Sequence, residues 1–403
     1  MENKKITLKP LKLNGLSYNG NLQIGKNANN NDDILNDPNV KIINRVLVSN
    51  GINCSCVKII KGIMENQFHF ELLDFTTTIK QISKYKEILL THLRVDNVKI
   101  ERSQECAGFV IIIPVVQRPM VHFANVMEHN PNYPCSTFEA PLTLALGIDN
   151  ANNPVFINLE DAPHVLIAGQ TGSGKSTCMH SIISSLLFSR YANMLNLVLI
   201  DPKQVEFSKY DGLKYYLNDS TVITKNHEVP NMLYNICGEM DWRYSKFKEK
   251  GVNNIIGYNK SLENDVSQYL TRIVVIIDEM ADLILSNPQE ITTLLVRIAQ
   301  MGRAAGIHLI LSTQRPSREV LPGLLKANIP VKICFKVTTA INSRVILDTK
   351  GAEELIGKGD GLLDNGRDGL QRFQGCCLTE EDIDTIIDNV NKNCVLDCSS
   401  TTN

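Results

Sequence analysis

One short loop constrains this sequence more than any other feature. Residues 169–176 match the pattern G-x-x-x-x-G-K-[ST] in full, and this pattern is typical of loops that bind nucleotide phosphates. An apolar, strand-like run, Val165–Ala168, precedes the loop, and an apolar, helix-like stretch follows it. That order matters, because backbone N–H groups and the start of a helix must face the phosphates together.

We therefore predict a site for ATP and Mg²⁺ at this loop. Lys175 is expected to bridge the β- and γ-phosphates, and Ser176 to offer its hydroxyl to Mg²⁺. The expected nucleotide-binding residues are Gly169, Gln170, Thr171, Gly172, Ser173, Gly174, Lys175, Ser176 and Thr177.

A second strand-like run, Arg272–Ile277, ends in two acids, Asp278 and Glu279. Sites that cleave phosphate bonds place one acid at such a strand end to hold Mg²⁺ and a second to polarise the attacking water. We expect Asp278 to hold Mg²⁺ through water and Glu279 to act as the general base. The alternative is that both are ordinary turn residues.

Hydrolysis also benefits from a sensor of the γ-phosphate and from a cation near the transition state. Gln314 follows the apolar run Ile307–Leu311 and is expected to lie beside the phosphate loop as that sensor, unless it is an ordinary polar strand end. The candidate cations are Arg303, at the end of an amphipathic stretch, and Arg344. Either arginine can instead balance a helix C-terminus.

The C-terminal part of the chain alternates between strand-like and helix-like segments. Short, nearly continuous runs of Val, Ile and Leu are typical of strands buried on both faces of a parallel sheet, and the helical stretches between them indicate a β-α-β-α order. We expect an α/β fold with a mostly parallel sheet. The expected strands are 164–168, 195–200, 273–277, 307–311 and 331–337, and the expected helices are 175–189, 229–247 and 289–303.

The rest of the chain divides into an arm, a smaller domain and a linker. Residues 1–39 are rich in asparagine and poor in aliphatic side chains, which favours a flexible arm. Residues 40–127 show the pattern of a small α/β domain. Polar and proline residues at 128–141 indicate a linker, which leaves 142–390 as the larger domain and 391–403 as a polar tail.

Charge and apolar content exclude several classes of protein. Lys plus Arg number 41 against 43 Asp plus Glu, which excludes coating of nucleic acid through bulk charge but allows a local basic path. No apolar run approaches the roughly 18 residues that span a bilayer, and no apolar stretch follows Lys4 and Lys5 as in a signal peptide. The 11 cysteines lie mostly in apolar runs and indicate reduced thiols. We expect a cytoplasmic protein with no transmembrane segment of its own.

Beyond the phosphate loop, an ordered series of motifs resembles the motor module of the FtsK/SpoIIIE family of double-stranded DNA translocases. The series runs from residue 163 to residue 363. Its motifs include Pro163-His164, Leu199-Ile200-Asp201-Pro202-Lys203 with Val205-Glu206, Asp278-Glu279-Met280-Ala281-Asp282-Leu283, Gly302-Arg303-Ala304-Ala305-Gly306, Thr313-Gln314-Arg315-Pro316, Lys326-Ala327-Asn328-Ile329-Pro330 and Gly359-Asp360-Gly361-Leu362-Leu363.

The resemblance implies a RecA-like P-loop NTPase core preceded by a smaller α/β subdomain. It also implies a homo-oligomer, a hexameric ring, that hydrolyses ATP at subunit interfaces and moves double-stranded DNA through its channel. Arg303 would then complete a neighbour's site, with Arg344 as the alternative. Arg315 and Lys326 would contact DNA phosphates, a mode of binding that reads no bases.

The sequence departs from the family pattern in a few places. We expect neither membrane helices ahead of the motor nor a winged-helix module behind it, and Ala340 stands where many family members have a lysine. Septal anchoring and sequence-directed movement are therefore not expected. The alternative function is a conjugation-type coupling or genome-packaging ATPase that docks DNA to a membrane or capsid partner.

Overall fold

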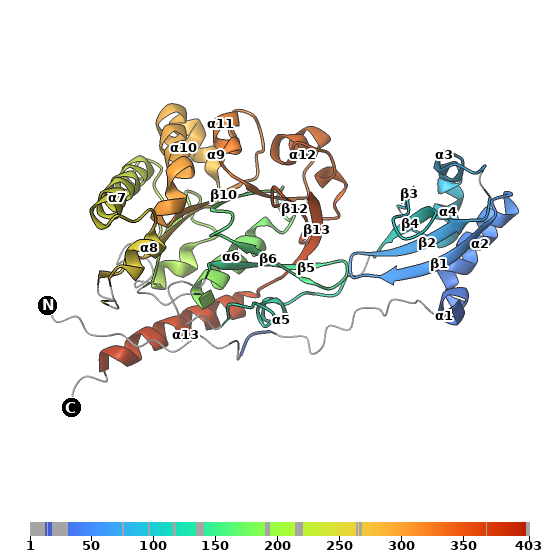
Figure 1. Cartoon of the computed structure of the whole chain (residues 1–403), viewed down its shortest axis with the longest axis horizontal. Coiled ribbons are helices and arrows are strands. Elements are labelled where there is room, and N and C mark those ends of the chain that lie inside the picture. Colours follow the sequence, from blue (N-terminus) through green and yellow to red (C-terminus); the bar gives the residue numbers. More distant parts are fainter. Residues whose placement is uncertain are drawn as a thin grey trace. The chain divides into compact units, whose positions relative to one another are not determined.

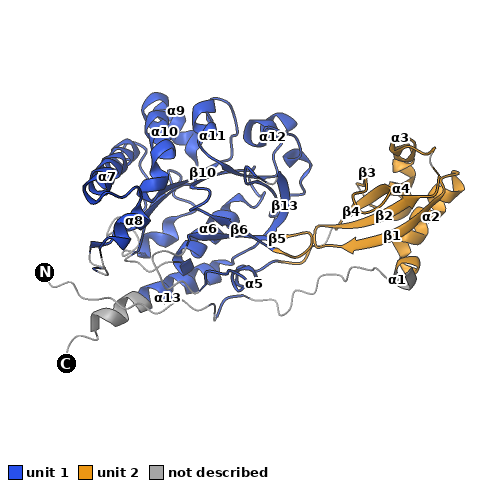
Figure 2. Cartoon of the chain, viewed as in Figure 1, with its two compact units in different colours: residues 1–19, 121–147, 154–403 blue, residues 20–120, 148–153 orange. Residues whose placement is uncertain are grey.

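The computed structural model describes residues 13, 15–17, 31–74, 76–95, 97–115, 118–133, 141–189, 194–213, 221–262, 265, 268–367 and 369–399. Most of the expected arm, residues 134–140 of the expected linker and residues 400–403 of the expected tail lie outside this part. Contacts divide the chain into two compact units, coloured separately in Figure 2. The larger unit takes residues 1–19, 121–147 and 154–403, and the smaller unit takes residues 20–120 and 148–153.

This division differs from the boundary after residue 127 that we expected. Helix α5, Phe123–Met127, belongs to the larger unit. The backbone N–H of Phe123 donates a hydrogen bond of 3.0 Å to the Cys377 carbonyl, and the Phe123 ring lies 5.8 Å from the ring of Phe188. These contacts are made with distant segments, so the local sequence did not indicate them.

In the smaller unit, an antiparallel sheet with the order β1-β2-β4-β3 packs against helices. Strand β2 buries Phe68 and Phe70, and Phe70 stacks on Phe109 with the ring centroids 5.3 Å apart. Its strands are β1 Cys54–Lys61, β2 Glu65–Leu72, β3 Lys99–Arg102 and β4 Gly108–Pro114, and its helices are α1 Asn31–Asn36, α2 Pro38–Ser49, α3 Ile79–Ser83 and α4 Lys86–Leu93.

Residues 31–39, which we expected in the flexible arm, form α1 and the first residues of α2. The reason lies in Asp37 and Pro38 at the start of α2. The Asp37 carboxylate accepts a hydrogen bond of 2.9 Å from the backbone N–H of Asn39, and Pro38 has the backbone angle that a first helical residue needs. The helix then buries Val40, Ile43 and Leu47.

The sheet of the larger unit has the order β6-β5-β13-β12-β11-β7-β10-β9-β8. Strands β11, β7, β10, β9 and β8 run parallel to one another, which confirms the expected α/β core. We did not anticipate the extension by β12 and β13, which pair antiparallel beside β11. The bounds are β5 Thr143–Asp149, β6 Pro154–Asn158, β7 His164–Ala168, β8 Leu195–Ile200, β9 Arg272–Ile277, β10 Ile307–Thr313, β11 Val331–Phe335, β12 Asp360–Asp364 and β13 Leu370–Gly375.

Helices cover both faces of this sheet (Figure 1). The α7, α9 and α10 helices lie on one face and bury a large aliphatic cluster against it, whereas α6 and α13 lie on the other. The helices are α6 Lys175–Ser189, α7 Val229–Lys250, α8 Ile255–Lys260, α9 Met280–Ser286, α10 Pro288–Ala305, α11 Gly323–Ala327, α12 Ala340–Leu347 and α13 Glu380–Ser399, with short 3₁₀ turns η1 Ser208–Gly212 and η3 Ala352–Glu354. Helix α13 continues past residue 390, where we expected the polar tail to begin.

Candidate functional site

The phosphate loop joins the end of β7 to the start of α6, as the sequence predicted. Its shape depends on two glycines with positive φ, Gly172 at +75° and Gly174 at +113°. A Cβ on Gly174 would lie 2.6 Å from the backbone nitrogen of Gly359, so no side chain fits there. The Gly359 N–H in turn donates a hydrogen bond of 2.8 Å to the Ser173 carbonyl.

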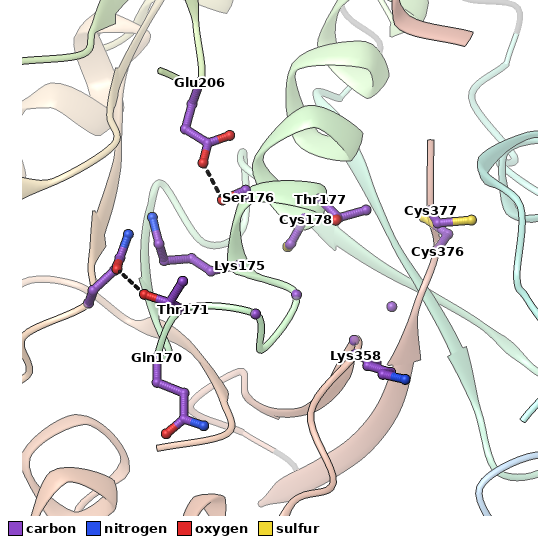
Figure 3. A pocket seen from close by; sticks show the side chains of 15 residues that line it. Gln170, Thr171, Lys175, Ser176, Thr177, Cys178, Glu206, Lys358, Cys376 and Cys377 are labelled. Carbon is purple, nitrogen blue, oxygen red and sulfur yellow. Dashed lines mark hydrogen bonds between the residues drawn. The ribbon is translucent and has the colours of Figure 1, made fainter. Parts of the chain in front are cut away.

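A cavity of about 370 Å³ opens over this loop (Figure 3). Seven of the expected nucleotide-binding residues line it, and Gly169 and Ser173 do not; the seven are Gln170, Thr171, Gly172, Gly174, Lys175, Ser176 and Thr177. The opposite wall comes from residues 358–359, directly before β12, and from residues 375–377, at the end of β13. Sequence reasoning missed this wall, because an antiparallel strand far along the chain supplies it.

The residues present fit a nucleotide triphosphate. Glycines keep the loop backbone close to the cavity, the N-terminus of α6 points at it, and such helix starts attract anions. The Ser173 hydroxyl is buried and has no hydrogen-bond partner among the described residues, so a polar donor remains within the loop. These are the features that the sequence led us to expect of an ATP site.

Lys175 is buried at the base of the loop. Its ammonium donates hydrogen bonds to Asp278 Oδ1 at 2.7 Å and to Ser312 Oγ at 2.8 Å. Burial raises the pKa of Asp278 above its ordinary value, while the charge of Lys175 acts in the opposite direction. A triphosphate in the cavity would therefore compete with Asp278 for this ammonium, since both offer it negative oxygens.

Ser176 has a partner that we did not predict, the carboxylate of Glu206. Ser176 Oγ donates a hydrogen bond of 2.6 Å to Glu206 Oε1, and Glu206 lines the cavity. His180 Nε2 lies 3.5 Å from Glu206 Oε2, and this contact is the largest of those that lower the pKa of Glu206. The hydroxyl and the carboxylate are the oxygen ligands that Mg²⁺ prefers, so the pair fits that cation.

The segment after β8 positions Glu206. The Asp201 carboxylate accepts hydrogen bonds of 2.9 Å from the backbone N–H groups of Glu206 and Phe207. Carboxyl ends of parallel strands meet at one edge of a sheet, so β8 and β7 both deliver their following residues to this edge. We did not apply that rule to the acids after Ile200, and it is the signal by which the sequence would have pointed to Glu206.

The expected general base, Glu279, is fully buried. Its Oε1 accepts a hydrogen bond of 2.7 Å from the Thr313 hydroxyl, and its Oε2 accepts one of 3.0 Å from the backbone N–H of Gln314. Among the described residues that line the cavity, neither Asp278 nor Glu279 is present. Both acids therefore lie behind the cavity wall, in contact with protein groups.

Gln314 lies where the parallel sheet was expected to bring it. Its Oε1 accepts a hydrogen bond of 2.9 Å from the Thr171 hydroxyl, and it lines the cavity. The register of β10 with β7 explains this, because Thr313 is paired with Ala168, so Gln314 follows β10 at the level where the phosphate loop follows β7.

Arg303 is not brought to this cavity. It lies in the last turn of α10, where its Nη2 and Nε donate hydrogen bonds of 2.9 and 3.2 Å to the Glu160 carbonyl. Since α10 leads into the start of β10, Arg303 occupies the edge of the sheet opposite the phosphate loop.

Several other cationic side chains lie on the segments that follow β10 and β11. Arg318, Lys326 and Arg344 line a cleft of about 430 Å³, and the Arg315 side chain is exposed. The Lys326 ammonium donates hydrogen bonds to the Val345 carbonyl at 2.6 Å and to Asp348 Oδ1 at 2.7 Å. Lys326 thus stabilises the end of α12 within the chain.

Comparison with known proteins agrees with these observations. A sequence model of the FtsK/SpoIIIE family matches residues 127–318. The chain is 37% identical over 355 residues to a protein named DNA translocase FtsK from Caldanaerobacter subterraneus, covering 88% of this chain and 49% of that protein. It is 44% identical over 256 residues to DNA translocase SftA from Bacillus subtilis, covering 63% of this chain and 27% of that protein. The chain spans about half the length, or less, of these curated relatives.

Two solved structures share the fold. One is the monomer form of the pCW3 conjugation coupling protein TcpA with ATPγS, at a TM-score of 0.61 and 26% identity, covering 88% of this chain and 99% of that one. The other is the cytoplasmic domain of the type VII secretion ATPase EccC from Thermomonospora curvata, at a TM-score of 0.59 and 24% identity, covering 68% of this chain and 34% of that one. In the described part of this chain, no helix has both the length and the apolar character that crossing a membrane requires.

Proposed function

This chain carries an ATPase domain of the FtsK/SpoIIIE family, and we propose that it uses ATP hydrolysis to move along double-stranded DNA. The observation that carries the proposal is its 37% identity, over 88% of its length, to a protein named DNA translocase. The cavity over the phosphate loop supports it, because the residues there suit a triphosphate and Mg²⁺.

In the proposed mechanism, ATP supplies the free energy and Mg²⁺ neutralises charge on the phosphates. Lys175 would leave Asp278 for the β- and γ-phosphates, and the Ser176 oxygen would help to hold Mg²⁺ while the Ser176 hydroxyl keeps donating its hydrogen bond to Glu206. Asp278, freed of Lys175, would then be able to hold Mg²⁺ through water. Glu279 accepts a proton from the attacking water after it leaves its present partners, and Gln314 responds to the γ-phosphate from beside Thr171.

We propose that DNA phosphates are contacted by the segments after β10 and β11. Arg315 has an exposed side chain, and Arg318 and Arg344 line a common cleft with Lys326. Guanidinium groups bind phosphates without reading bases, as movement over any sequence requires. Lys326 can bind a DNA phosphate only if it releases Asp348. The proposal therefore depends most on Arg315.

We further propose that the chain works as a homohexameric ring in the cytoplasm, where ATP is available. The position of Arg303 supports the ring. Arg303 lies at the edge of the sheet opposite its own phosphate loop, so it can take part in ATP hydrolysis only at the cavity of a neighbouring copy. The guanidinium is tethered only to a carbonyl of Glu160 among the contacts that the structure describes, and it can exchange this partner for a phosphate.

One observation favours a second candidate function, a conjugation-type coupling ATPase that docks DNA to a membrane partner. The conjugation coupling protein TcpA matches 88% of this chain and is covered over 99% of its own length. Under this second function the chain would use the same ATP site, but DNA would move only when the membrane partner is present.

A triplex-displacement assay on naked linear duplex separates the two functions. We expect the purified chain with ATP to strip a third strand from the duplex without any partner, and Lys175→Ala to abolish this. Duplex-stimulated hydrolysis without displacement supports the coupling function instead. If duplex leaves the hydrolysis rate unchanged, both DNA functions are wrong.

A further inference from the structure

The hydroxyl of Thr313, at the end of β10, connects Glu279 with the segment that follows this strand. It donates the hydrogen bond of 2.7 Å to Glu279 Oε1 and accepts one of 3.0 Å from the backbone N–H of Arg315. Thr313 and Glu279 are both fully buried. A hydroxyl held from both sides keeps one orientation, because the N–H of Arg315 occupies a lone pair and leaves the hydrogen pointing at the carboxylate.

The neighbouring residue holds the other oxygen of Glu279. The backbone N–H of Gln314 donates to Oε2 at 3.0 Å, and the Lys203 ammonium lies 3.5 Å from the same oxygen. These contacts satisfy the carboxylate behind the cavity wall. A general base must come within hydrogen-bond reach of the water it deprotonates, so Glu279 has to leave this position before it can act.

Residues 313–315 therefore link the proposed general base, the phosphate loop and the proposed DNA contact. Thr313 and Gln314 hold Glu279, the Gln314 side chain bonds Thr171 of the phosphate loop, and Arg315 presents an exposed guanidinium. A shift of this short segment at either end is transmitted to the carboxylate through one or two hydrogen bonds.

We propose that Thr313 is a positioning residue that keeps Glu279 withdrawn until DNA contacts the segment after β10. The proposal rests on the proposed function, since it takes Arg315 as a DNA contact. The Arg315 side chain would bind a phosphate while its backbone N–H orients the Thr313 hydroxyl. Displacement of Arg315 by DNA breaks that hydrogen bond and lets the hydroxyl turn. Glu279 Oε1 then loses its shortest hydrogen bond and keeps the longer ones from the backbone N–H groups of Gln314 and Ala281, at 3.3 and 3.4 Å, so the carboxylate is held less tightly and can leave for the cavity.

Thr313→Val tests this directly, because valine keeps the branched shape and lacks the hydroxyl. Steady-state ATP turnover is measured with and without a long blunt duplex of mixed sequence. We expect the rate without DNA to rise about ten-fold, the usual order for one lost hydrogen bond to a charged group, and the ratio of the two rates to fall toward one. Thr313→Ser, which keeps the hydroxyl, should restore the low rate without DNA and the response to duplex.

A matched control is Thr143→Val in β5. Thr143 is also buried, and its hydroxyl accepts a hydrogen bond of 3.0 Å from Asn132 Nδ2, away from the cavity. The same chemical change there should leave both rates at the wild-type level. A rise in the DNA-free rate in both valine variants would overturn the proposal, because the effect would then be general loosening of the sheet.

The outcomes also separate this proposal from the proposed function. If wild-type turnover ignores duplex but Thr313→Val turns over faster, the restraint on Glu279 stands and the DNA function fails. If wild-type turnover responds to duplex and Thr313→Val keeps the same two rates, or loses both, the restraint is wrong.

The wild-type chain allows a check that does not depend on the folding of a variant. Amide hydrogen exchange of Gln314 and Arg315 is measured with ATPγS and Mg²⁺, with and without the same duplex. These two amides donate to Glu279 and Thr313, so under saturating duplex we expect both to exchange faster. Exchange that stays the same or slows on a duplex-bound protein overturns the proposal.

Discussion

A pair of buried histidines makes the larger unit sensitive to mild acid. His164 begins β7 and His308 lies in β10, and both are fully buried. His164 Nδ1 accepts a hydrogen bond of 3.0 Å from the backbone N–H of Leu309, and His308 Nδ1 lies 3.1 Å from the Pro163 carbonyl. Burial, which penalises the charged ring, lowers the pKa of each histidine from 6.5 to about 3.

The size of the effect follows from proton linkage. The folded state keeps both rings neutral above about pH 3, whereas the unfolded chain binds a proton at each histidine below pH 6.5. The stability that the two sites contribute is therefore fully present above pH 6.5 and is lost as the pH falls from 6.5 toward 3. Between pH 7.5 and pH 5.5 each site loses about 1.4 kcal/mol, so the pair loses about 2.8 kcal/mol.

Urea unfolding at these two pH values measures the difference. The chain has one tryptophan, Trp242, which lies in α7 of the larger unit, so its fluorescence reports the unfolding of that unit. We expect the free energy of unfolding at pH 5.5 to be about 2.8 kcal/mol below the value at pH 7.5. His308→Asn, which removes one titrating ring and keeps an N–H donor for the Pro163 carbonyl, should halve the difference.

Each comparison is made within one variant, so a constant loss of stability in His308→Asn cancels. The reasoning is refuted if the wild-type difference stays below about 1 kcal/mol, or if His308→Asn retains the whole difference.

Three further substitutions probe the ATP site and its neighbours. Glu206→Gln should weaken the binding of the metal in the presence of ATP about ten-fold, as loss of a group that orients a metal ligand usually does; Mn²⁺ binding followed by electron paramagnetic resonance would show no change if Glu206 has no such role. Gly174→Ala should lower the free energy of unfolding by at least about 1–3 kcal/mol and abolish binding of a fluorescent ATP analogue, because the loop has φ +113° and a facing backbone nitrogen at 2.6 Å. Gly238→Ala, at an open helical position, is its control and should be neutral or stabilising. Arg303→Ala should abolish hydrolysis but recover part of it when mixed with Lys175→Ala, and no recovery at any mixing ratio would argue against action on a neighbouring copy.

Much of the site was predictable because its parts are local in sequence. The glycines, lysine and serine of residues 169–176 specify a phosphate loop wherever a strand precedes and a helix follows, since the backbone geometry and the helix start arise from neighbouring residues. The expected helix at 175–189 was found with the same bounds. Gln314 could be placed because parallel strands deliver their ends to one edge of the sheet.

The antiparallel half of the sheet was not predictable in the same way. Strands β12 and β13 are short, and each gains its stability from a partner strand and not from its own pattern. They supply the wall of the cavity at residues 375–377, so the full shape of the site followed from contacts between distant segments.

The amino-acid sequence by itself determined the phosphate loop, the acids after β9 and the parallel order of the core strands, because spacing and local chemistry are enough for each. Only the tertiary structure decided what those acids touch. Lys175 meets Asp278 across 103 residues, and Thr313 meets Glu279 across 34. A buried charge takes whichever donors the packing brings near it, and no periodicity in the chain records that choice.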